Sequence, residues 1–434
     1  LGQYPQAINS YNKVLELAPK HAGAEKDRAV ARYSLAQEYH KQGVSHDRVG
    51  QYGQAIQNYN KALELTPTDA KAYQNRAGSF QNLGEYWKAV SDYNKVVDLD
   101  PTNVKAYYDR GVSFGKLEEY QQAIGSYIQV LELDPNNVEA YNNMGLIHDK
   151  LSQYSLALQN YRLVLELDPK NAEAYNNMGL IYSRQHQYQQ AIINFFHSIE
   201  LDPNNAIVYY NRGNVYKELG QYRHALENYD RAIALDSSFS SVELFHSRGL
   251  SNDFLGRYRQ AIEDYNKVLG LKPTDVPAYF KRGTVYQSLG TNQDPMVNYG
   301  NALKDYDKVI TLDPNYLAVY ARKEAVVGLL VEEYYLIGVS HLDGLEYNHA
   351  IGAFNRVIEL TAIDARAYVK MGVAYQGLID HVQAIASYDK AISLDQDYAL
   401  AFKNRGVSLE AIGQAEEAAS DYRRACALDI ALCN

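Results

Sequence analysis

The chain has 434 residues, with 42 Lys and Arg against 52 Asp and Glu, which gives a net charge of −10. A nucleic-acid-binding protein would carry clustered Lys and Arg, and no basic stripe is present, so nucleic-acid partners are not expected. The longest apolar run, Ala325 to Val331, is far shorter than the roughly 20 residues of a membrane-spanning helix, so no membrane insertion is expected.

The sequence contains few features that indicate a cellular compartment. No charged and apolar leader follows Leu1, so we expect a cytoplasmic location, with the reservation that an incomplete start would hide an upstream leader. Cys426 and Cys433 are the two cysteines of the chain, and two are too few for a disulfide framework.

The dominant feature of the chain is a regular period, marked by prolines that each close a variant of the phrase Y-x-x-A-I-x-x-Y-x-x-x-x-x-L-D-P. These prolines are Pro67, Pro101, Pro135, Pro169 and Pro203. A constant spacing of about 34 residues is typical of a helix–turn–helix unit that cannot bury its own apolar face and must stack on its neighbours. We therefore expect residues 1–434 to form a single repeat array.

In chain order, residues 1–19 are expected to form a half repeat that contains a second helix only. Full repeats are expected to end near residues 67, 101, 135, 169, 203, 237, 273, 314, 362, 396 and 430. No first helix precedes the half repeat and no extra amphipathic helix follows Leu428. Because solenoids usually carry polar terminal caps, these ends favour either a fragment or ends that pack on something else.

One unit carries the family resemblance in full. Ahead of Pro135 come small, aromatic and glycine residues in the order Ala106-Tyr107, Gly111, Phe114, Tyr120, Ala123 and Tyr127. This order resembles the tetratricopeptide repeat (TPR), and the resemblance covers essentially the whole chain. It implies an all-α, right-handed superhelical solenoid of tandem helix–turn–helix repeats. The same motif serves scaffolds, chaperone adaptors and the substrate-recruiting arms of enzymes.

Residue types within a unit have physical roles. A mid-helix glycine such as Gly111 costs roughly 1 kcal/mol against alanine, so we expect it to allow close approach of the second helix, with Ala123 on the opposing face. Asn137 and Asn171 follow the prolines and are expected to cap the next helix. Most of the 40 tyrosines fall at aromatic positions of the motif and are expected in the core.

Three units are longer than this period. The intervals from Pro19 to Pro67 and from Pro314 to Ala362 each contain 14 extra residues, and the unit around Pro295 contains seven. The sequence predicts enlarged turns at residues 43–51, 290–298 and 338–346, with the other seven residues of the longer insertions ahead of the first helix. The two longer units match at one constant offset, which aligns Gly43 with Gly338 and indicates duplication of a block of eight units.

The candidate binding residues lie on the first helices. In proteins that this chain resembles, the first helix of each unit lines a concave groove, and the residue two positions before the mid-helix glycine points into it. Those residues are Asp109, Asn143, Asn177, Asn211 and Asn404, and the proline register of the unit that ends at Pro101 adds Asn75. Their neighbours Tyr108, Asn142, Asn176 and Tyr210 complete the predicted site. An asparagine amide offers a donor and an acceptor, which match the backbone of an extended peptide. The alternative is that these asparagines serve the fold alone.

Other recurring residues favour structural roles. Arg76, Arg248, Arg282 and Arg405 each occur in a unit that also carries Asp ahead of the second-helix tyrosine, which predicts an ion pair within the unit. The carboxylate clamp of chaperone-binding TPR domains is absent, because Phe280 and Thr284 stand where its first pair belongs, although Arg366 and Lys370 match its last pair.

No chemistry is indicated. The chain has no phosphate-binding loop, G-x-S-x-G elbow or H-E-x-x-H motif, so we expect neither an enzyme nor a cofactor. His46 and His341 each have one Asp nearby, Asp47 and Asp343, and one His with one Asp makes a poor metal site, so no metal is expected.

The sequence therefore favours a non-catalytic scaffold that binds protein or peptide segments along a concave groove, with basic segments suited to its acidic balance. A structural building block that self-associates through its turns and ends is the first alternative. A substrate-recruiting TPR arm of a larger enzyme, such as a glycosyltransferase, is the second.

Overall fold

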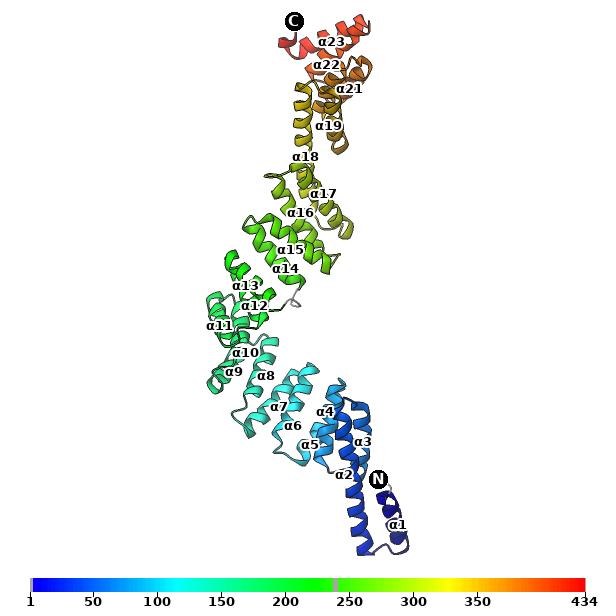
Figure 1. The fold of residues 1–434 in the computed structure, drawn as a ribbon, viewed down its shortest axis with the longest axis vertical. Coiled ribbons are helices and arrows are strands. Elements are labelled where there is room, and N and C mark those ends of the chain that lie inside the picture. Colours follow the sequence, from blue (N-terminus) through cyan, green and yellow to red (C-terminus); the bar gives the residue numbers. More distant parts are fainter. Residues whose placement is uncertain (1–2, 237–240, 434) are drawn as a thin grey trace. The chain divides into compact units, whose positions relative to one another are not determined.

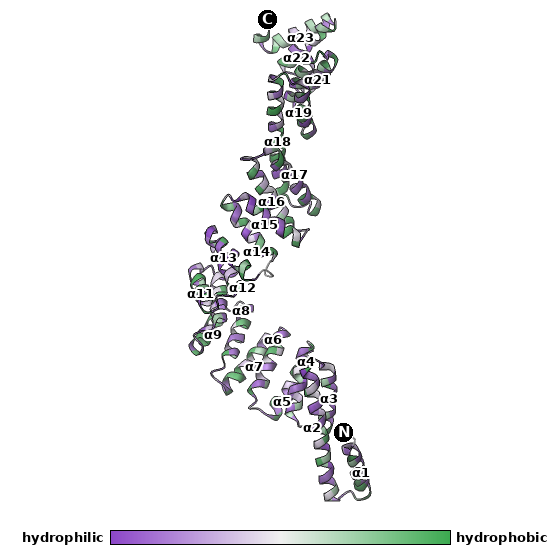
Figure 2. Ribbon diagram, viewed as in Figure 1, coloured by the Kyte–Doolittle hydropathy of each residue, from purple (hydrophilic) through white to green (hydrophobic). Residues whose placement is uncertain are grey.

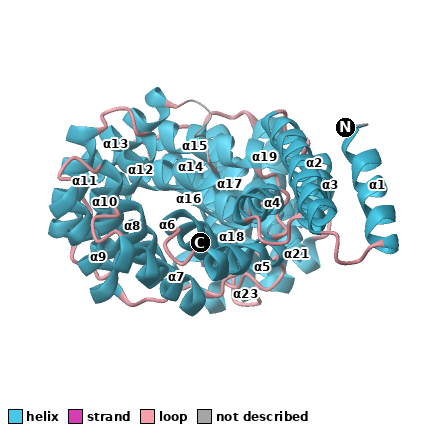
Figure 3. Cartoon of the chain, turned by 90° about the horizontal axis from the view of Figure 1, so that it is seen from below, coloured by secondary structure: helices cyan, strands magenta, loops and turns pink. Residues whose placement is uncertain are grey.

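The computed structural model describes residues 3–236 and 241–433, and the described residues form 23 α-helices, one short 3-10 helix and no strand (Figure 3). The helices follow one another in first-helix and second-helix pairs, as the period of the sequence predicts (Figure 1). The prediction of an all-α tandem repeat fold is confirmed. Contact clustering divides the chain into two compact units, Leu1–Val215 and Tyr216–Asn434.

The first unit contains the half repeat and the repeats that follow it. Its helices are α1 (Gln3–Leu17), α2 (Ala22–Arg48), α3 (Tyr52–Leu65), α4 (Ala70–Asn82), α5 (Tyr86–Leu99), α6 (Val104–Lys116), α7 (Tyr120–Leu133), α8 (Val138–Lys150), α9 (Tyr154–Leu167), α10 (Ala172–Arg184), α11 (Tyr188–Leu201) and most of α12 (Ala206–Glu218).

The second unit continues the same alternation. Its helices are α13 (Tyr222–Leu235), α14 (Val242–Phe254), α15 (Tyr258–Leu271), α16 (Val276–Gly290), α17 (Pro295–Leu312), α18 (Ala318–Asp343), α19 (Tyr347–Leu360), α20 (Ala365–Gly377), α21 (His381–Leu394), α22 (Ala399–Ala411) and α23 (Ala415–Leu428), with the 3-10 helix η1 (Ile430–Leu432) last.

Side-chain caps start most first helices. The Asn137 side chain accepts a hydrogen bond from the backbone N–H of Ala140 at 3.0 Å, and Asn171 accepts one from Ala174 at 2.9 Å. These bonds satisfy amides that have no partner within the helix, so the predicted capping role is confirmed. The repeat end predicted near Ser237 lies outside the described residues.

The turn within a repeat is three residues long in most units, and its middle residue has a positive φ. Glycine occupies that place in some repeats, as at Gly84 with φ 76° and Gly413 with φ 84°. In others a residue with a side chain adopts it, as at Ile379 with φ 61°. Only glycine adopts this left-handed conformation without a steric cost.

The mid-helix glycines pack against an aromatic ring of the second helix, which refines the sequence prediction. A Cβ added at Gly111 would lie 2.7 Å from the ring of Tyr127, and one at Gly145 would lie 2.8 Å from the ring of Tyr161. Both rings are buried, as is Ala123. Close approach is confirmed, but the group that meets the glycine is the tyrosine ring and not the alanine.

The enlarged turns predicted at residues 43–51 and 338–346 are wrong. Residues up to Arg48 belong to α2 and residues up to Asp343 belong to α18, so that each turn keeps three residues and the insertions are helical. Gly43 meets the ring of Tyr59 and therefore takes the place of a mid-helix glycine, not of a turn. The additional residues precede it, in helices of 27 and 26 residues where ordinary first helices have 13.

The third enlarged turn, predicted at residues 290–298, is also mostly helical. Gly290 ends α16, which has 15 residues, and Pro295 begins α17, which has 18. Four residues, 291–294, remain between the two helices. Proline is accepted here because the first turn of a helix has no partner for its amide.

One described helix, α18, is long and apolar enough to cross a membrane by length and composition. Helices that serve as the core of a soluble protein meet the same criterion, and α18 contributes Val326 and Leu330 to the cluster around α17, and Val331 to the cluster around α19. Hydrophobic and hydrophilic residues are mixed along it, as along the other helices (Figure 2). The absence of membrane insertion stays a prediction.

The two cysteines are linked. Cys426 in α23 and Cys433, after η1, form a disulfide across a sequence separation of seven. The argument from cysteine number excluded a framework of several bridges, but it missed this local link, which joins the last turn of the chain to α23.

Candidate functional site

The predicted site residues all lie on first helices and all are partly exposed. Asn75 lies on α4, Tyr108 and Asp109 on α6, Asn142 and Asn143 on α8, Asn176 and Asn177 on α10, Tyr210 and Asn211 on α12, and Asn404 on α22. All but Asn404 belong to the first unit. The first unit therefore contains an uninterrupted series of these positions over five first helices.

Hydrogen bonds between neighbouring repeats connect this series, and three of them join partners that are 35 positions apart in the sequence. The Asn143 amide donates to the hydroxyl of Tyr108 at 3.0 Å, and the Asn211 amide donates to Asn176 Oδ1 at 3.1 Å. Asn75 Nδ2 lies 2.9 Å from His40 Nε2, at the same spacing. Part of the series thus joins one repeat to the next, as the structural alternative expects.

Asn142 and Asn177 stand at the same spacing, but among the described residues Asn142 Oδ1, Asn177 Nδ2 and the hydroxyl of Tyr161, which lies near Asn177, are buried without a hydrogen bond of ordinary geometry. The Asn142 amide nitrogen is engaged, since it donates to Glu173 Oε1 at 3.4 Å. We call Asn142 and Asn177 the open rung. It leaves one acceptor and one donor unsatisfied in adjacent repeats, and such groups cost free energy when buried.

A cavity of about 650 Å³ opens beside the start of the series in the first unit. Asn75 and Asp109 line it, and so do Lys71, Lys105 and His40, which the sequence analysis missed. The missed lysines share a signal: each stands four residues before a predicted site residue, and residues four apart lie on one face of a helix.

Charge within this cavity is mixed. Burial raises the pKa of Asp109, and Lys105, whose Nζ lies 3.3 Å from Asp109 Oδ2, opposes that shift. Asp47 accepts hydrogen bonds from the hydroxyls of Tyr59 at 2.6 Å and Ser79 at 2.7 Å. Lys71 is exposed at the rim. The cavity therefore offers cationic groups in a chain that is acidic as a whole.

Two smaller cavities follow along the same unit. Tyr108 and Lys105 line one of about 400 Å³, and Asn143 lines one of about 190 Å³ together with Tyr127 and Leu146. These three cavities together take in four of the predicted residues: Asn75, Tyr108, Asp109 and Asn143.

Asn404, in the second unit, belongs to a copy of a polar network seen in the first. Gln376 donates to the Asn404 carbonyl at 2.8 Å and accepts from the Tyr388 hydroxyl at 2.9 Å. Gln81, its counterpart in the first unit, makes the same bonds to the Asp109 carbonyl at 2.8 Å and with Tyr93 at 2.8 Å. The contacts repeat at the offset that aligns Gly43 with Gly338 in the sequence.

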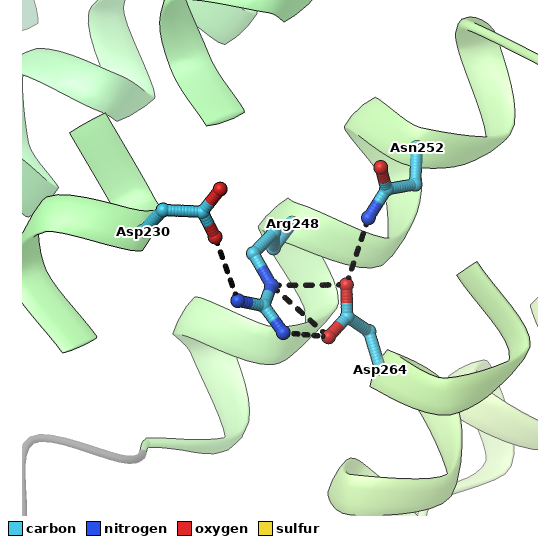
Figure 4. A network of polar contacts seen from close by, with 4 residues as sticks. All are labelled: Asp230, Arg248, Asn252 and Asp264. Carbon is cyan, nitrogen blue, oxygen red and sulfur yellow. Dashed lines mark hydrogen bonds and ion pairs between the residues drawn. The ribbon is translucent and has the colours of Figure 1, made fainter. Parts of the chain in front are cut away.

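The predicted ion pairs within units are confirmed. Each arginine reaches the aspartate of its own second helix in the pairs Arg76–Asp92, Arg248–Asp264, Arg282–Asp305 and Arg405–Asp421. The same guanidinium also bonds a side chain on the preceding second helix. The sequence analysis missed this third member of each network. Arg248 Nη1 donates to Asp230 Oδ1 at 2.8 Å, and Asn252 donates to Asp264 Oδ2 at 3.0 Å (Figure 4).

Burial makes these arginines structural. The Asp264 side chain is 1% exposed, and burial raises its pKa although Arg248 and Asn252 hydrogen-bond to it. Burial also acts against the charge of Arg248, but its hydrogen bonds to Asp264 and Asp230 outweigh this and raise its pKa. Arg366, considered for a carboxylate clamp, bonds Glu332 at 2.7 Å and Asp364 at 2.8 Å.

Comparisons with known proteins agree with this architecture. Models described as tetratricopeptide repeats or TPR repeats match residues 49–84, 79–118, 116–152, 150–186, 172–205, 206–239, 255–290 and 365–398, which together exceed half of the chain. No curated protein sequence matches the chain.

Several solved structures are similar over part of the chain. A crystal structure titled YrrB, a TPR protein with an unusual peptide-binding site, is 28% identical and covers 42% of this chain and 93% of its own, with a TM-score of 0.35. MamA from Desulfovibrio magneticus is 26% identical, covers 40% and 97%, and has a TM-score of 0.37. A tetratricopeptide repeat protein from Parabacteroides merdae is 18% identical, covers 58% and 99%, and has a TM-score of 0.46. These partial likenesses carry no functional argument.

Repeats of this kind are protein-interaction modules and are typically non-catalytic, which supports a protein-binding scaffold as the class of function. The recurring glycine–ring contacts, the aromatic positions and the matches to the repeat models agree throughout, and the chain belongs to the tetratricopeptide repeat family.

Proposed function

We propose that the first unit binds an extended segment of a partner protein along the first helices α4, α6, α8 and α10. The segment would lie over the cavity at Asn75 and Asp109 and reach the open rung at Asn142 and Asn177. An extended backbone offers N–H and C=O groups in alternation, which complement an asparagine acceptor and an asparagine donor.

The open rung is the observation that carries this proposal. Its equivalents bind each other between repeats, whereas Asn142 Oδ1 and Asn177 Nδ2 find no partner among the described residues. Both atoms are covered, so a bound segment would engage them after rotation of the amides. A peptide group that bonds both would relieve two unsatisfied groups at once, which favours binding at this position.

Lysine chemistry at the cavity favours an acidic side chain in the bound segment. Lys71 and Lys105 line the same 650 Å³ space together with Asp47 and Asp109. Lys105 already pairs with Asp109, so the exposed Lys71 is the group that would form charge-assisted hydrogen bonds with a carboxylate. This local charge differs from the net charge of −10, which by itself favours basic partners. Lys71 acts at contact distance, so we propose an acidic residue beside it.

The test is selection of random peptides displayed on phage, followed by affinity measurement with the full chain. We expect the double variant Asn142→Ala/Asn177→Ala to bind a selected peptide about tenfold more weakly, since two hydrogen bonds contribute roughly 0.5–1.5 kcal/mol each. Replacing Lys71 by Gln should weaken binding of peptides that contain Asp or Glu and leave neutral peptides unaffected.

The matched control is Asn143→Ala/Asn211→Ala. This variant removes two amides that bond neighbouring repeats, so it should lower the melting temperature more than the open-rung variant does. Equal peptide affinity in the wild type and the open-rung variant would reject the proposal, as would a selection that enriches no peptide. Self-association, the alternative prediction, would show as a mass that rises with concentration in light scattering.

A further inference from the structure

Three potential metal ligands meet at the turn between α18 and α19. His341 lies near the end of α18, Glu346 is the N-cap residue of α19, and His349 lies in its first turn. Their ligand atoms all lie within 4.8 Å of one another. Glu346 Oε2 is 2.7 Å from His341 Nδ1 and 3.5 Å from His349 Nδ1, and the two imidazole rings are 5.3 Å apart.

The sequence analysis paired His341 with Asp343 and expected no metal. The structure groups His341 with Glu346 and His349 instead, because the tight turn folds the end of α18 back over the start of α19. Glu346 and His349 are three residues apart, so they share one face of that helix.

The duplicated copy of this turn shows which part of the arrangement is structural. At the offset that aligns Gly43 with Gly338, His46, Gln51 and Gln54 stand in place of His341, Glu346 and His349. His46 Nδ1 lies 2.7 Å from Gln51 Oε1, so a hydrogen bond from histidine across the turn forms without any carboxylate. The turn therefore needs neither Glu346 nor His349. Where the first copy has the amides of Gln51 and Gln54, the second copy has two groups that can bind a metal.

We propose that His341, Glu346 and His349 bind a divalent transition-metal ion, with Zn²⁺ as the reference ion. Imidazole nitrogen and carboxylate oxygen are the ligands of protein zinc sites that use three side chains and keep a fourth position open. Zinc–ligand bonds of about 2.0–2.2 Å place tetrahedral ligands roughly 3.4 Å apart. The 3.5 Å between Glu346 and His349 already suits this, and the 2.7 Å between Glu346 and His341 needs a small side-chain rotation.

Exposure makes the site accessible. The side chains of His341, Glu346 and His349 are 37%, 55% and 75% exposed, so an ion would enter without movement of the backbone. The open position would take water or a ligand group from a bound protein. Binding would tie α19 to α18 across a turn that contains Leu345 with φ 61°.

The experiment is calorimetric titration of the full chain with ZnCl₂ at neutral pH, with Co²⁺ absorption as a second readout of coordination. The variants Glu346→Gln and His349→Gln recreate the Gln51 and Gln54 arrangement, which the fold already accepts. We expect the wild type to bind Zn²⁺ at this site and each variant to bind it at least tenfold more weakly, with visible Co²⁺ bands only in the wild type.

The reverse variant, Gln51→Glu/Gln54→His, should add a second Zn²⁺ equivalent to the chain. The chain has 11 histidines, so Zn²⁺ bound with equal affinity and stoichiometry in the wild type and in both Gln variants would assign it elsewhere and overturn the proposal. No binding to the wild type would overturn it as well.

Discussion

The partly buried guanidinium of Arg248 connects three helices through side chains alone. It bonds Asp264 on α15 and Asp230 on α13 from its own position on α14. The same arrangement recurs at Arg405, which bonds Asp421 and Asp389 at 2.7 and 2.5 Å. Within each pair the partners are mutually dependent, because a buried charge that loses its counter-ion is strongly destabilising.

We expect Arg248→Met to reduce the free energy of unfolding by about 3 kcal/mol, since it leaves the Asp264 carboxylate buried with Asn252 as its remaining described partner. Urea denaturation followed by circular dichroism measures the loss. The double variant Arg248→Met/Asp264→Asn should recover part of it, because no unpaired charge then remains. A double variant as unstable as the single one would show that packing, not charge, carries the effect.

Much of this residue-scale order was visible in the sequence. Arginine and aspartate occur together in the same repeats, which predicted the ion pair. The contact of each arginine with the preceding second helix could also have been predicted, because its partners share one position. Asn60, Asp230 and Asp389 each follow the buried tyrosine of that helix. The open rung was not, since it depends on which of several equivalent amides come within bonding distance.

The three-residue turns within repeats differ in backbone strain. Ile379 has φ 61° and is 78% exposed, so its side chain gains little from packing. A residue with a Cβ loses roughly 1–2 kcal/mol in this conformation, and a β-branched residue is a clear outlier there. Gly413 occupies the equivalent place one repeat later without that cost.

We therefore expect Ile379→Gly to increase the free energy of unfolding by about 1 kcal/mol. The reciprocal variant Gly413→Ile should decrease it by at least as much. Both are measured as shifts in the urea midpoint at constant slope. A loss of stability in Ile379→Gly would mean that the exposed side chain makes contacts that outweigh its backbone strain.

The wrong predictions of enlarged turns came from how glycine was interpreted. Gly43-Val44-Ser45-His46 was interpreted as a turn because glycine usually marks one. Its distance from Pro67 equals that of Gly111 from Pro135, so the repeat register already identified it as a mid-helix position. The helical nature of the preceding insertion was harder to predict, since it carries neither a proline boundary nor a strong apolar period.

Across the whole molecule, contacts are local in sequence. Within each of the two units, most described helices pack mainly on the helices directly before and after them, which is the basis of the nearly one-dimensional stability of repeat arrays. The tandem fold was predictable from the register of prolines and glycines. The division at Val215 and Tyr216 was not, because no linker composition marks it.

A local defect should therefore stay local. Gly145→Ala places a methyl group 2.8 Å from the Tyr161 ring, and such overpacking costs roughly 1–3 kcal/mol. We expect faster amide hydrogen exchange in α8, α9 and their neighbours, with α20 and α21 unchanged. Gly125→Ala is the control, because nothing lies within 4 Å of its added Cβ. Uniformly faster exchange along the chain would contradict local stability.

The long helices α2 and α18 show how such an array can lengthen. α2 is 14 residues and α18 is 13 residues longer than an ordinary first helix of 13 residues. The 14 residues in α2 amount to about 3.9 turns and a rise of about 21 Å, so the far end of α2 returns to within roughly 40° of its starting orientation. Gly43 and Gly338 follow the extra residues and meet Tyr59 and Phe354 just as ordinary glycines meet their rings, while Val319 and Val326, earlier in α18, pack against α17. In α2, growth by a nearly integral number of turns lengthens the repeat while the start of the helix keeps the face that it presents to the preceding repeat, and an insertion half a turn out of phase would rotate that start away from it.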